Sequence, residues 1–176
     1  NDYGSADYYY VNKSSLPKVY GGFNTSLSWK GFDLSAIFAY SIGGYIYNRD
    51  ITMILHNGSL EGRDWSTEIL KRWTPDNRNT DVPALSTTTN NWNSASTRFL
   101  QNNSYMRLKN LTLSYNLPKQ WISKLSLSSV QVYVQGDNLF TIHRNQGLDP
   151  EQGITGITYY RYPAMRTISG GINVSF

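Results

Sequence analysis

The sequence of 176 residues contains no cysteine, and this absence excludes both a disulfide framework and metal sites built from thiolates. Charged residues are scarce too: they make up 16% of the chain, where a typical soluble domain has about 25%. The net charge of +4 is small, and Lys and Arg form no run, so no nucleic-acid partner is expected. No stretch approaches the roughly 18 consecutive apolar residues of a transmembrane helix.

Histidine is nearly absent as well, and little in the chain points to catalysis. The two histidines, His56 and His143, are far apart in the sequence and lie in predicted loops. No nucleophile stands out beside a base, and neither a phosphate-binding loop nor a cluster of metal ligands is found. The sequence therefore predicts that the protein is not an enzyme, with no catalytic residues, no cofactor and no metal.

Aromatic residues are abundant, at 14% of the chain, and residue types alternate strictly at the C-terminal end. One phase of this alternation consists of Ile168, Gly170, Ile172, Val174 and Phe176, and the other of Thr, Ser, Asn and Gly. Period two predicts a β-strand with different surroundings on its two faces. The nine residues 168–176 match the roughly 9–11 with which a tilted strand crosses a bilayer. A terminal aromatic residue suits the closing strand of a membrane barrel.

Four further strands are predicted from the same alternation, over residues 19–29, 32–42, 105–117 and 130–141. Lys30-Gly31 predicts a tight hairpin turn between the first two. In the third strand, Met106 and Leu108 are out of phase with Leu111 and Leu113. This slip predicts a bulge, or an upper part of the strand that stands clear of the apolar surroundings.

Two long connections, 43–104 and 142–164, alternate with two short ones along the chain. One short helix is expected in the longer connection, because Asp64 can cap it and Pro75 can end it. The shared face of that helix would consist of Trp65, Ile69, Leu70 and Trp73. Alternation of short and long connections is typical of outer-membrane barrels, whose short turns are periplasmic and whose long loops are extracellular.

The fold class predicted from these patterns is all-β: an antiparallel transmembrane β-barrel segment of about five strands, with long extracellular loops and one short loop helix. Five strands do not close a barrel, since outer-membrane barrels have at least about eight, so a larger barrel is expected. The chain begins at Asn1 without a signal sequence, as a mature product or a fragment would. Composition also suits a soluble β-sandwich that binds carbohydrate, and the topology suits a passive porin or adhesin barrel; both alternatives stay open.

Two stretches near the C-terminus resemble a known family. Residues 135–151 read QGDNLFTIHRNQGLDPE, and residues 162–176 read YPAMRTISGGINVSF. Together they resemble the C-terminal end of SusC/RagA-type TonB-dependent outer-membrane transporters of the Bacteroidetes, with their N-L-F-T, G-x-D-P-E and Y-P-x-x-R-T motifs. Residues 107–118, RLKNLTLSYNLP, and 16–23, LPKVYGGF, are similar to the family as well, whereas the resemblance does not extend to 43–104.

This resemblance implies the C-terminal part of a TonB-dependent receptor barrel over residues 1–176, within a roughly 22-stranded barrel. The plug domain and the earlier strands would lie outside these residues. The resemblance also implies location in the outer membrane and uptake of oligomeric substrates, glycans or peptides. The implied partners are a SusD/RagB-like lipoprotein as a lid, the TonB complex through the missing N-terminal part, and outer-membrane lipid.

Three tryptophans of the first long connection are candidates for contact with substrate or lid, because flat aromatic rings pack on sugar rings: Trp65, Trp73 and Trp92. Trp92 lies among asparagines in a polar stretch. For Trp65 and Trp73 the alternative is burial on the inner face of the loop helix.

Arg161 is the fourth candidate, for contact with an acidic ligand or with the lid. Its alternative is a structural ion pair with Asp149 or Glu151 at the top of the last strand. Asp149-Pro150 is itself expected to form a turn rather than part of a carboxylate site.

The apolar faces of the predicted strands are expected to touch lipid. Those residues are Phe32, Leu34, Phe38, Leu111, Leu113, Tyr115, Val130, Val132, Val134, Ile168, Ile172 and Val174. Near the short turns, aromatic residues are expected to form a girdle at the membrane boundary, as is typical of barrels. The girdle residues would be Trp29, Phe32, Tyr115 and Trp121.

Overall fold

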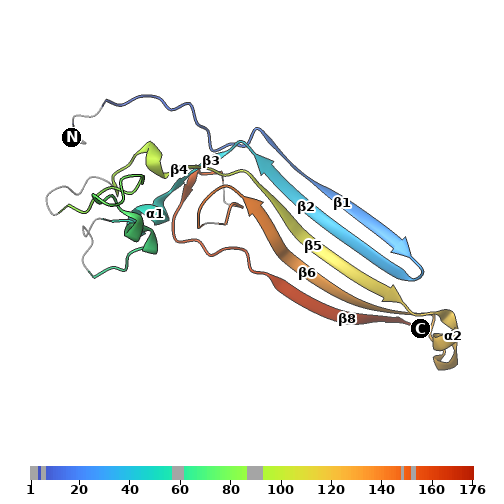
Figure 1. The fold of residues 1–176 in the computed structure, drawn as a ribbon. Helices are drawn as coiled ribbons and strands as arrows, with labels where there is room; N and C mark the ends of the chain where they lie inside the picture. Colours follow the sequence, from blue (N-terminus) through green and yellow to red (C-terminus); the bar gives the residue numbers. More distant parts are fainter. Residues whose placement is uncertain (1–3, 5–6, 57–61, 87–92, 148, 152–153) are drawn as a thin grey trace.

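The computed structural model describes residues 1–176 except 1–3, 5–6, 57–61, 87–92, 148 and 152–153, and its centre is one antiparallel sheet (Figure 1). Five strands form it in the order β1-β2-β5-β6-β8. They span Val19–Trp29, Phe32–Ile42, Tyr105–Asn116, Ser129–His143 and Thr167–Ser175. The five strands predicted from the alternation are therefore confirmed, and their predicted ends agree closely with the observed ones.

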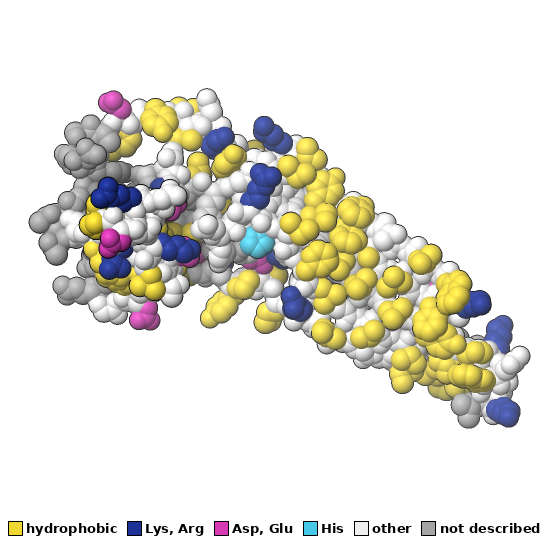
Figure 2. Space-filling view, viewed as in Figure 1, with side chains coloured by type: hydrophobic (Ala, Val, Ile, Leu, Met, Phe, Trp, Pro, Cys, Tyr) yellow, Lys and Arg dark blue, Asp and Glu magenta, His cyan; other side chains and the backbone are white. Residues whose placement is uncertain are grey.

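This sheet is a single layer whose edge strands are exposed on both faces. Every residue of the edge strand β1 is exposed, and so is every residue of the other edge strand, β8, except Gly171. Large apolar side chains lie open, with Leu27 67% exposed and Ile168 71% exposed. Figure 2 shows hydrophobic side chains along the length of the sheet. Because such a sheet has no core of its own, its apolar side chains need a cover from outside the chain.

Cross-strand register sorts the residues into one apolar and one polar face. One row across the sheet consists of Leu27, Leu34, Leu113, Val134 and Gly170. The neighbouring row on the opposite face consists of Ser26, Ser35, Thr112, Gln135 and Ser169. Directly opposed residues point to the same side of a sheet. The residues predicted to form an apolar face therefore do share one face.

The predicted bulge is confirmed in the ladder between β5 and β6. Leu108 pairs with Phe140, whereas Asn110 pairs with Asp137, so the register shifts across this point. The bulge keeps Leu108 on the apolar face despite the phase slip. On the polar face, Arg107 lies next to the bulge and is only 3% exposed.

The two long connections fold together at one end of the sheet (Figure 1). A small second sheet has the order β4-β3-β7, from Leu100–Asn102, Tyr45–Asn48 and Ile157–Thr158. Beside it lie α1 (Arg49–Ile54) and the 3-10 turns η2 (Thr67–Lys71) and η4 (Thr97–Phe99). The apolar core of the described residues sits largely here, and its loop members are Ile46, Leu55, Ile69, Val82 and Phe99.

The prediction of a helix after Asp64 is wrong in the type of helix and in its capping residue. The structure has a 3-10 turn there, η2, and its cap is Ser66, whose Oγ accepts a hydrogen bond from the Glu68 amide at 3.2 Å. Of the shared face predicted for that helix, Ile69 is buried, but Leu70 is 71% exposed. The helix α1 is an additional element, capped by Asn48, whose Oδ1 accepts from the Ile51 amide at 3.1 Å. No helix in the described part of the chain is long and apolar enough to cross a membrane.

The hairpin turn between β1 and β2 yields a first testable prediction. Lys30 and Gly31 have φ of 47° and 89°, as a two-residue turn of the favoured kind requires. A Cβ at Gly31 would meet the Asn116 carbonyl oxygen at 3.1 Å. We expect Gly31→Ala to lower the free energy of unfolding by about 1–2 kcal/mol, measured by urea unfolding of the refolded protein. Lys30→Asn, which suits left-handed backbone, is expected to cost nothing; equal losses in both variants would contradict the assignment.

Candidate functional site

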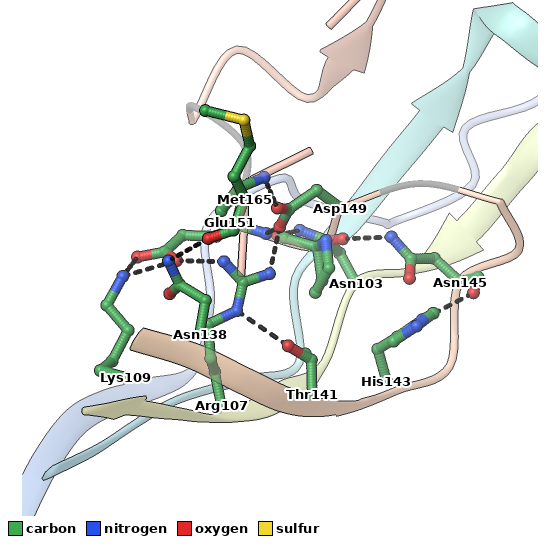
Figure 3. Close-up of polar contacts among 12 residues, drawn as sticks. Asn103, Arg107, Lys109, Asn138, Thr141, His143, Asn145, Asp149, Glu151 and Met165 are labelled. Carbon is green, nitrogen blue, oxygen red and sulfur yellow. Dashed lines mark hydrogen bonds and ion pairs between the residues drawn. The ribbon is translucent and has the colours of Figure 1, made fainter. Parts of the chain in front are cut away.

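Two carboxylates of the connection between β6 and β8 fold back onto the polar face of the sheet (Figure 3). Asp149 Oδ1 accepts a hydrogen bond from Arg107 Nη2, and Glu151 Oε2 accepts one from Arg107 Nη1 at 2.8 Å. Lys109 Nζ lies 2.8 Å from both carboxylate oxygens of Glu151. We call these four residues, Arg107, Lys109, Asp149 and Glu151, the latch. The latch ties one long connection to strand β5.

The two halves of the latch differ in burial. The side chains of Arg107 and Asp149 are 4% and 5% exposed, whereas those of Lys109 and Glu151 are 36% and 35% exposed. Arg107 Nε also donates to Thr141 Oγ1 at 2.9 Å, so the guanidinium has three partners. A solvent-exposed ion pair contributes only about 0–1 kcal/mol. The buried pair therefore dominates the energetics of the latch.

Backbone groups complete the surroundings of Asp149. Its Oδ2 accepts from the Ala164 amide at 2.6 Å, and its Oδ1 accepts from the Glu151 amide at 2.9 Å. The second of these bonds closes a local turn at Asp149-Pro150, which confirms the expected structural role of this dipeptide. The alternative for Arg161, an ion pair with one of these carboxylates, is wrong: in the described part of the chain the ion pairs of Asp149 and Glu151 are with Arg107 and Lys109.

Asparagine side chains hold the same connection at further points. Asn103 Nδ2 donates to the Pro150 carbonyl at 2.8 Å, and Asn138 Nδ2 donates to the Met165 carbonyl at 3.1 Å. Asn145 Nδ2 donates to Asn103 Oδ1 at 3.0 Å. These donors belong to both long connections and to β6, so the hydrogen bonds connect the two loops to one another and to the sheet (Figure 3).

The protonation of Asp149 predicts how the latch depends on pH. Burial alone would raise the pKa of this carboxyl, but hydrogen bonds from the Ala164 amide, the Arg107 guanidinium and the Glu151 amide outweigh burial and hold the pKa below its ordinary value of 3.8. Stabilisation by the latch is therefore complete above about pH 4 and is lost as the pH falls through the lowered pKa.

We expect hydrogen exchange in residues 144–147 and 149–151 to be slow at pH 7 and to accelerate, after correction for the intrinsic rate, once the pH falls below 3.8. The matched variant is Asp149→Asn, which has no charge to lose. Its exchange is expected to be fast already at neutral pH and to change little with acid. A wild-type profile as flat as that of the variant would contradict the role of the carboxylate.

Of the residues predicted to contact substrate or lid, the structure describes Trp65, Trp73 and Arg161. The Trp65 ring packs edge-on to the His56 ring with centroids 5.3 Å apart, and Trp65 and Trp73 are 40% and 43% exposed. Both tryptophans are thus half-open rather than buried. Arg161 is exposed in the segment before β8. Trp92 lies outside the described residues.

Two cavities near the loops are lined by other residues. The first, of about 320 Å³, has no charged side chain in its lining and contains four tyrosines: Tyr20, Tyr40, Tyr45 and Tyr105. Tyr20 and Tyr105 both stand opposite Ser41, so they belong to the polar face. The only feature of the sequence that could have predicted this cavity is the position of Tyr20 and Tyr105, two aromatic residues at polar-face positions of their strands.

The second cavity, of about 630 Å³, lies among α1, η2 and η4 and has a charged lining. Its charged residues are Asp50, Glu68, Lys71, Asp81 and Arg98. None of Trp65, Trp73 and Arg161 lines either cavity. Within the described ranges, no group of three His, Cys, Asp or Glu residues could hold a metal ion.

Comparisons with known proteins agree on one class. No protein-family model matches the chain. The chain is 35% identical over 166 residues to TonB-dependent receptor P3 of Formosa agariphila, which covers 88% of the chain and 16% of that protein. It is 27% identical over 168 residues to TonB-dependent receptor SusC of Bacteroides thetaiotaomicron, covering 95% of the chain and 16% of that protein.

Solved structures agree with the sequence matches. The structure of the RagAB peptide transporter is similar with a TM-score of 0.82 and 35% identity, over 94% of this chain and 18% of that one. The same transporter in its open-open state is similar with a TM-score of 0.81, over 94% of the chain. The chain spans less than a fifth of the length of these relatives.

An antiparallel single-layer sheet with one apolar face, together with these matches, defines a segment of a TonB-dependent transporter barrel. The chain is more narrowly a SusC/RagA-like segment, and the resemblance predicted from its motifs is confirmed. The relatives are receptors and transporters, which confirms that the chain is not an enzyme. The alternative of a soluble β-sandwich is wrong, because the matches are to transporters of this class and both faces of the edge strands β1 and β8 are exposed.

Proposed function

We propose that the chain forms part of the wall and two extracellular loops of an outer-membrane nutrient importer that depends on TonB. The observation that carries this proposal is the sheet with one apolar and one polar face, open on both. In a membrane barrel the apolar face contacts lipid and the polar face lines the lumen. In this assignment, lipid covers the exposed apolar side chains of β1 and β8.

The free edges of the sheet support a larger barrel. β1 and β8 each pair on one side only, and unpaired backbone groups in lipid cost several kcal/mol each. Residues 1–176 would be the C-terminal part of the barrel, and the strands that close it would lie in the rest of the protein. That remainder would also hold the plug and the segment that contacts the TonB complex.

A SusD/RagB-like lipoprotein is the partner that we propose at the mouth of the barrel. The two long connections are joined there by hydrogen bonds and form one continuous surface. The Tyr47 amide donates to the Gly156 carbonyl at 2.7 Å, and Asn48 Nδ2 donates to the Gln146 carbonyl at 3.2 Å. A surface that is rigid before contact binds a lid at a lower entropic cost.

The substrates that we propose are oligomeric, either glycans or peptides. Trp65, Trp73, Trp92 and Arg161 remain the proposed contacts with substrate or lid. The tyrosine-lined cavity adds a second place for a neutral ring to pack, because tyrosine combines a flat apolar face with a hydroxyl group. It lies on the polar face, which would border the lumen.

The proposal is tested on the full-length protein in its own bacterium. We expect the tagged protein to purify from the outer membrane together with a surface lipoprotein, identified by mass spectrometry. Deleting its gene should abolish growth on one class of glycan or peptide, and disabling TonB should have the same effect. Recovery of the protein from the soluble fraction would overturn the proposal. Uptake that survives the loss of TonB would favour the passive porin.

A further inference from the structure

The end of the sheet away from the loops carries two turns side by side. One is Lys30-Gly31, and the other contains α2 (Lys119–Ile122) and η5 (Ser123–Leu125). The Asn116 amide donates to the Gly31 carbonyl at 2.8 Å, which joins the first turn to the start of the second. Figure 2 shows Lys and Arg side chains gathered at this end, just beyond the hydrophobic side chains of the sheet.

Lysines outnumber acidic side chains at this end of the sheet. The two turns contain Lys30, Lys119 and Lys124, and residues 29–32 and 116–128 contain neither Asp nor Glu. The nearby Asp33 belongs to the polar face and already accepts a hydrogen bond from Asn116 Nδ2 at 2.7 Å. No ion pair joins the three lysines to a carboxylate in the described part of the chain. The three ammonium groups are thus available to an external anion.

Each of the two turns also has a tryptophan close to its lysines in the sequence. Lys30 Nζ lies 5.0 Å from the centroid of the Trp29 ring, and Trp29 stands opposite Phe32 on the apolar face. Trp121, between the other two lysines, is 64% exposed, as is Trp29. Tryptophan is enriched at the level of lipid headgroups. An ammonium group held over a tryptophan ring at this level, such as that of Lys30 over Trp29, would lie at the depth of the lipid phosphate groups.

We propose that Lys30, Lys119 and Lys124, with Trp29 and Trp121, bind the headgroups of anionic phospholipids in the periplasmic leaflet. The inference rests on the proposed orientation of the barrel in the outer membrane. An anionic lipid offers these lysines a net negative charge, whereas a zwitterionic headgroup brings an ammonium group of its own. Each basic residue near an anionic lipid surface is worth a factor of about five in binding.

The test is native mass spectrometry of the full transporter in detergent, titrated with phosphatidylglycerol or phosphatidylethanolamine. We expect the wild type to retain phosphatidylglycerol preferentially. Replacing all three lysines by Gln should weaken its retention by up to about a hundredfold, and replacing one by about fivefold. The matched control replaces three cations at the loop end, Lys13, Lys18 and Arg144, by Gln and should change nothing. If the wild type retained the two lipids equally, the site would be overturned. The same would follow if the triple-lysine variant and the loop-end control retained phosphatidylglycerol equally.

A second measurement separates this inference from the proposed function. Ser123, exposed in the α2 turn, is replaced by Cys, and whole cells are treated with a maleimide that cannot cross the outer membrane. Protection of this cysteine is expected if the turn faces the periplasm. Labelling from outside would overturn both the orientation and the site. Protection combined with no lipid preference would overturn the lipid site alone.

Discussion

Ile172→Arg is expected to remove most of the transporter from the outer membrane. Ile172 is 65% exposed on the apolar face, where it stands opposite Val132. It is the middle residue of the nine, 168–176, whose length matches a strand that crosses a bilayer. That position is mid-depth in the proposed bilayer, where Arg on a lipid face costs about 2–4 kcal/mol. The measurement is the amount of folded, heat-modifiable protein in outer-membrane fractions.

Two neighbouring substitutions provide the controls. Asn173→Arg puts the same side chain on the polar face of the same strand, opposite Gln131, and is expected to leave assembly unchanged. Ile168→Arg lies on the apolar face but at the start of the nine residues 168–176. Near the interface the cost falls to about 0–1 kcal/mol, so a small loss is expected. Equal losses at 172 and 173 would contradict the assignment of the two faces.

Local patterns explain why the sheet could be predicted from the sequence. Alternation with period two depends only on neighbouring residues, and so does the Lys30-Gly31 turn. The bulge near Lys109 was visible for the same reason, as a slip between two alternating stretches. In each case the signal lies within one strand and needs no knowledge of its partner.

The loop region could not be predicted because its structure depends on distant contacts. The helix α1 has only six residues, too few to show a helical period, and its cap Asn48 also bonds the distant Gln146 carbonyl. The tyrosine cavity takes Tyr20 and Tyr105 from strands that are far apart in the sequence. The partner of Asp149 was mistaken because Arg161 is close in sequence, whereas Arg107 is close in space.

Arg107→Gln is expected to release the connection between β6 and β8 from the wall. The substitution leaves the side chain of Asp149, 5% exposed, without its cationic partner. Removing one member of a buried ion pair costs about 3–5 kcal/mol, because the remaining charge stays buried and uncompensated. We expect rapid cleavage within residues 144–166 when folded transporter is treated with protease, although its level in the outer membrane stays normal.

The surrounding residues show which part of the latch carries this effect. Lys109→Gln removes a half-exposed partner, and its cost should stay within about 1 kcal/mol, with wild-type protease resistance. Adding Asp149→Asn to Arg107→Gln removes the stranded charge and should restore part of the resistance, since an uncharged pair carries no uncompensated ion. If Lys109→Gln exposed the connection as strongly as Arg107→Gln, burial would not be the source of the latch's strength. If the double variant were cleaved faster than Arg107→Gln, the Asp149 carboxylate would be holding the connection through the Ala164 and Glu151 amides rather than through the guanidinium.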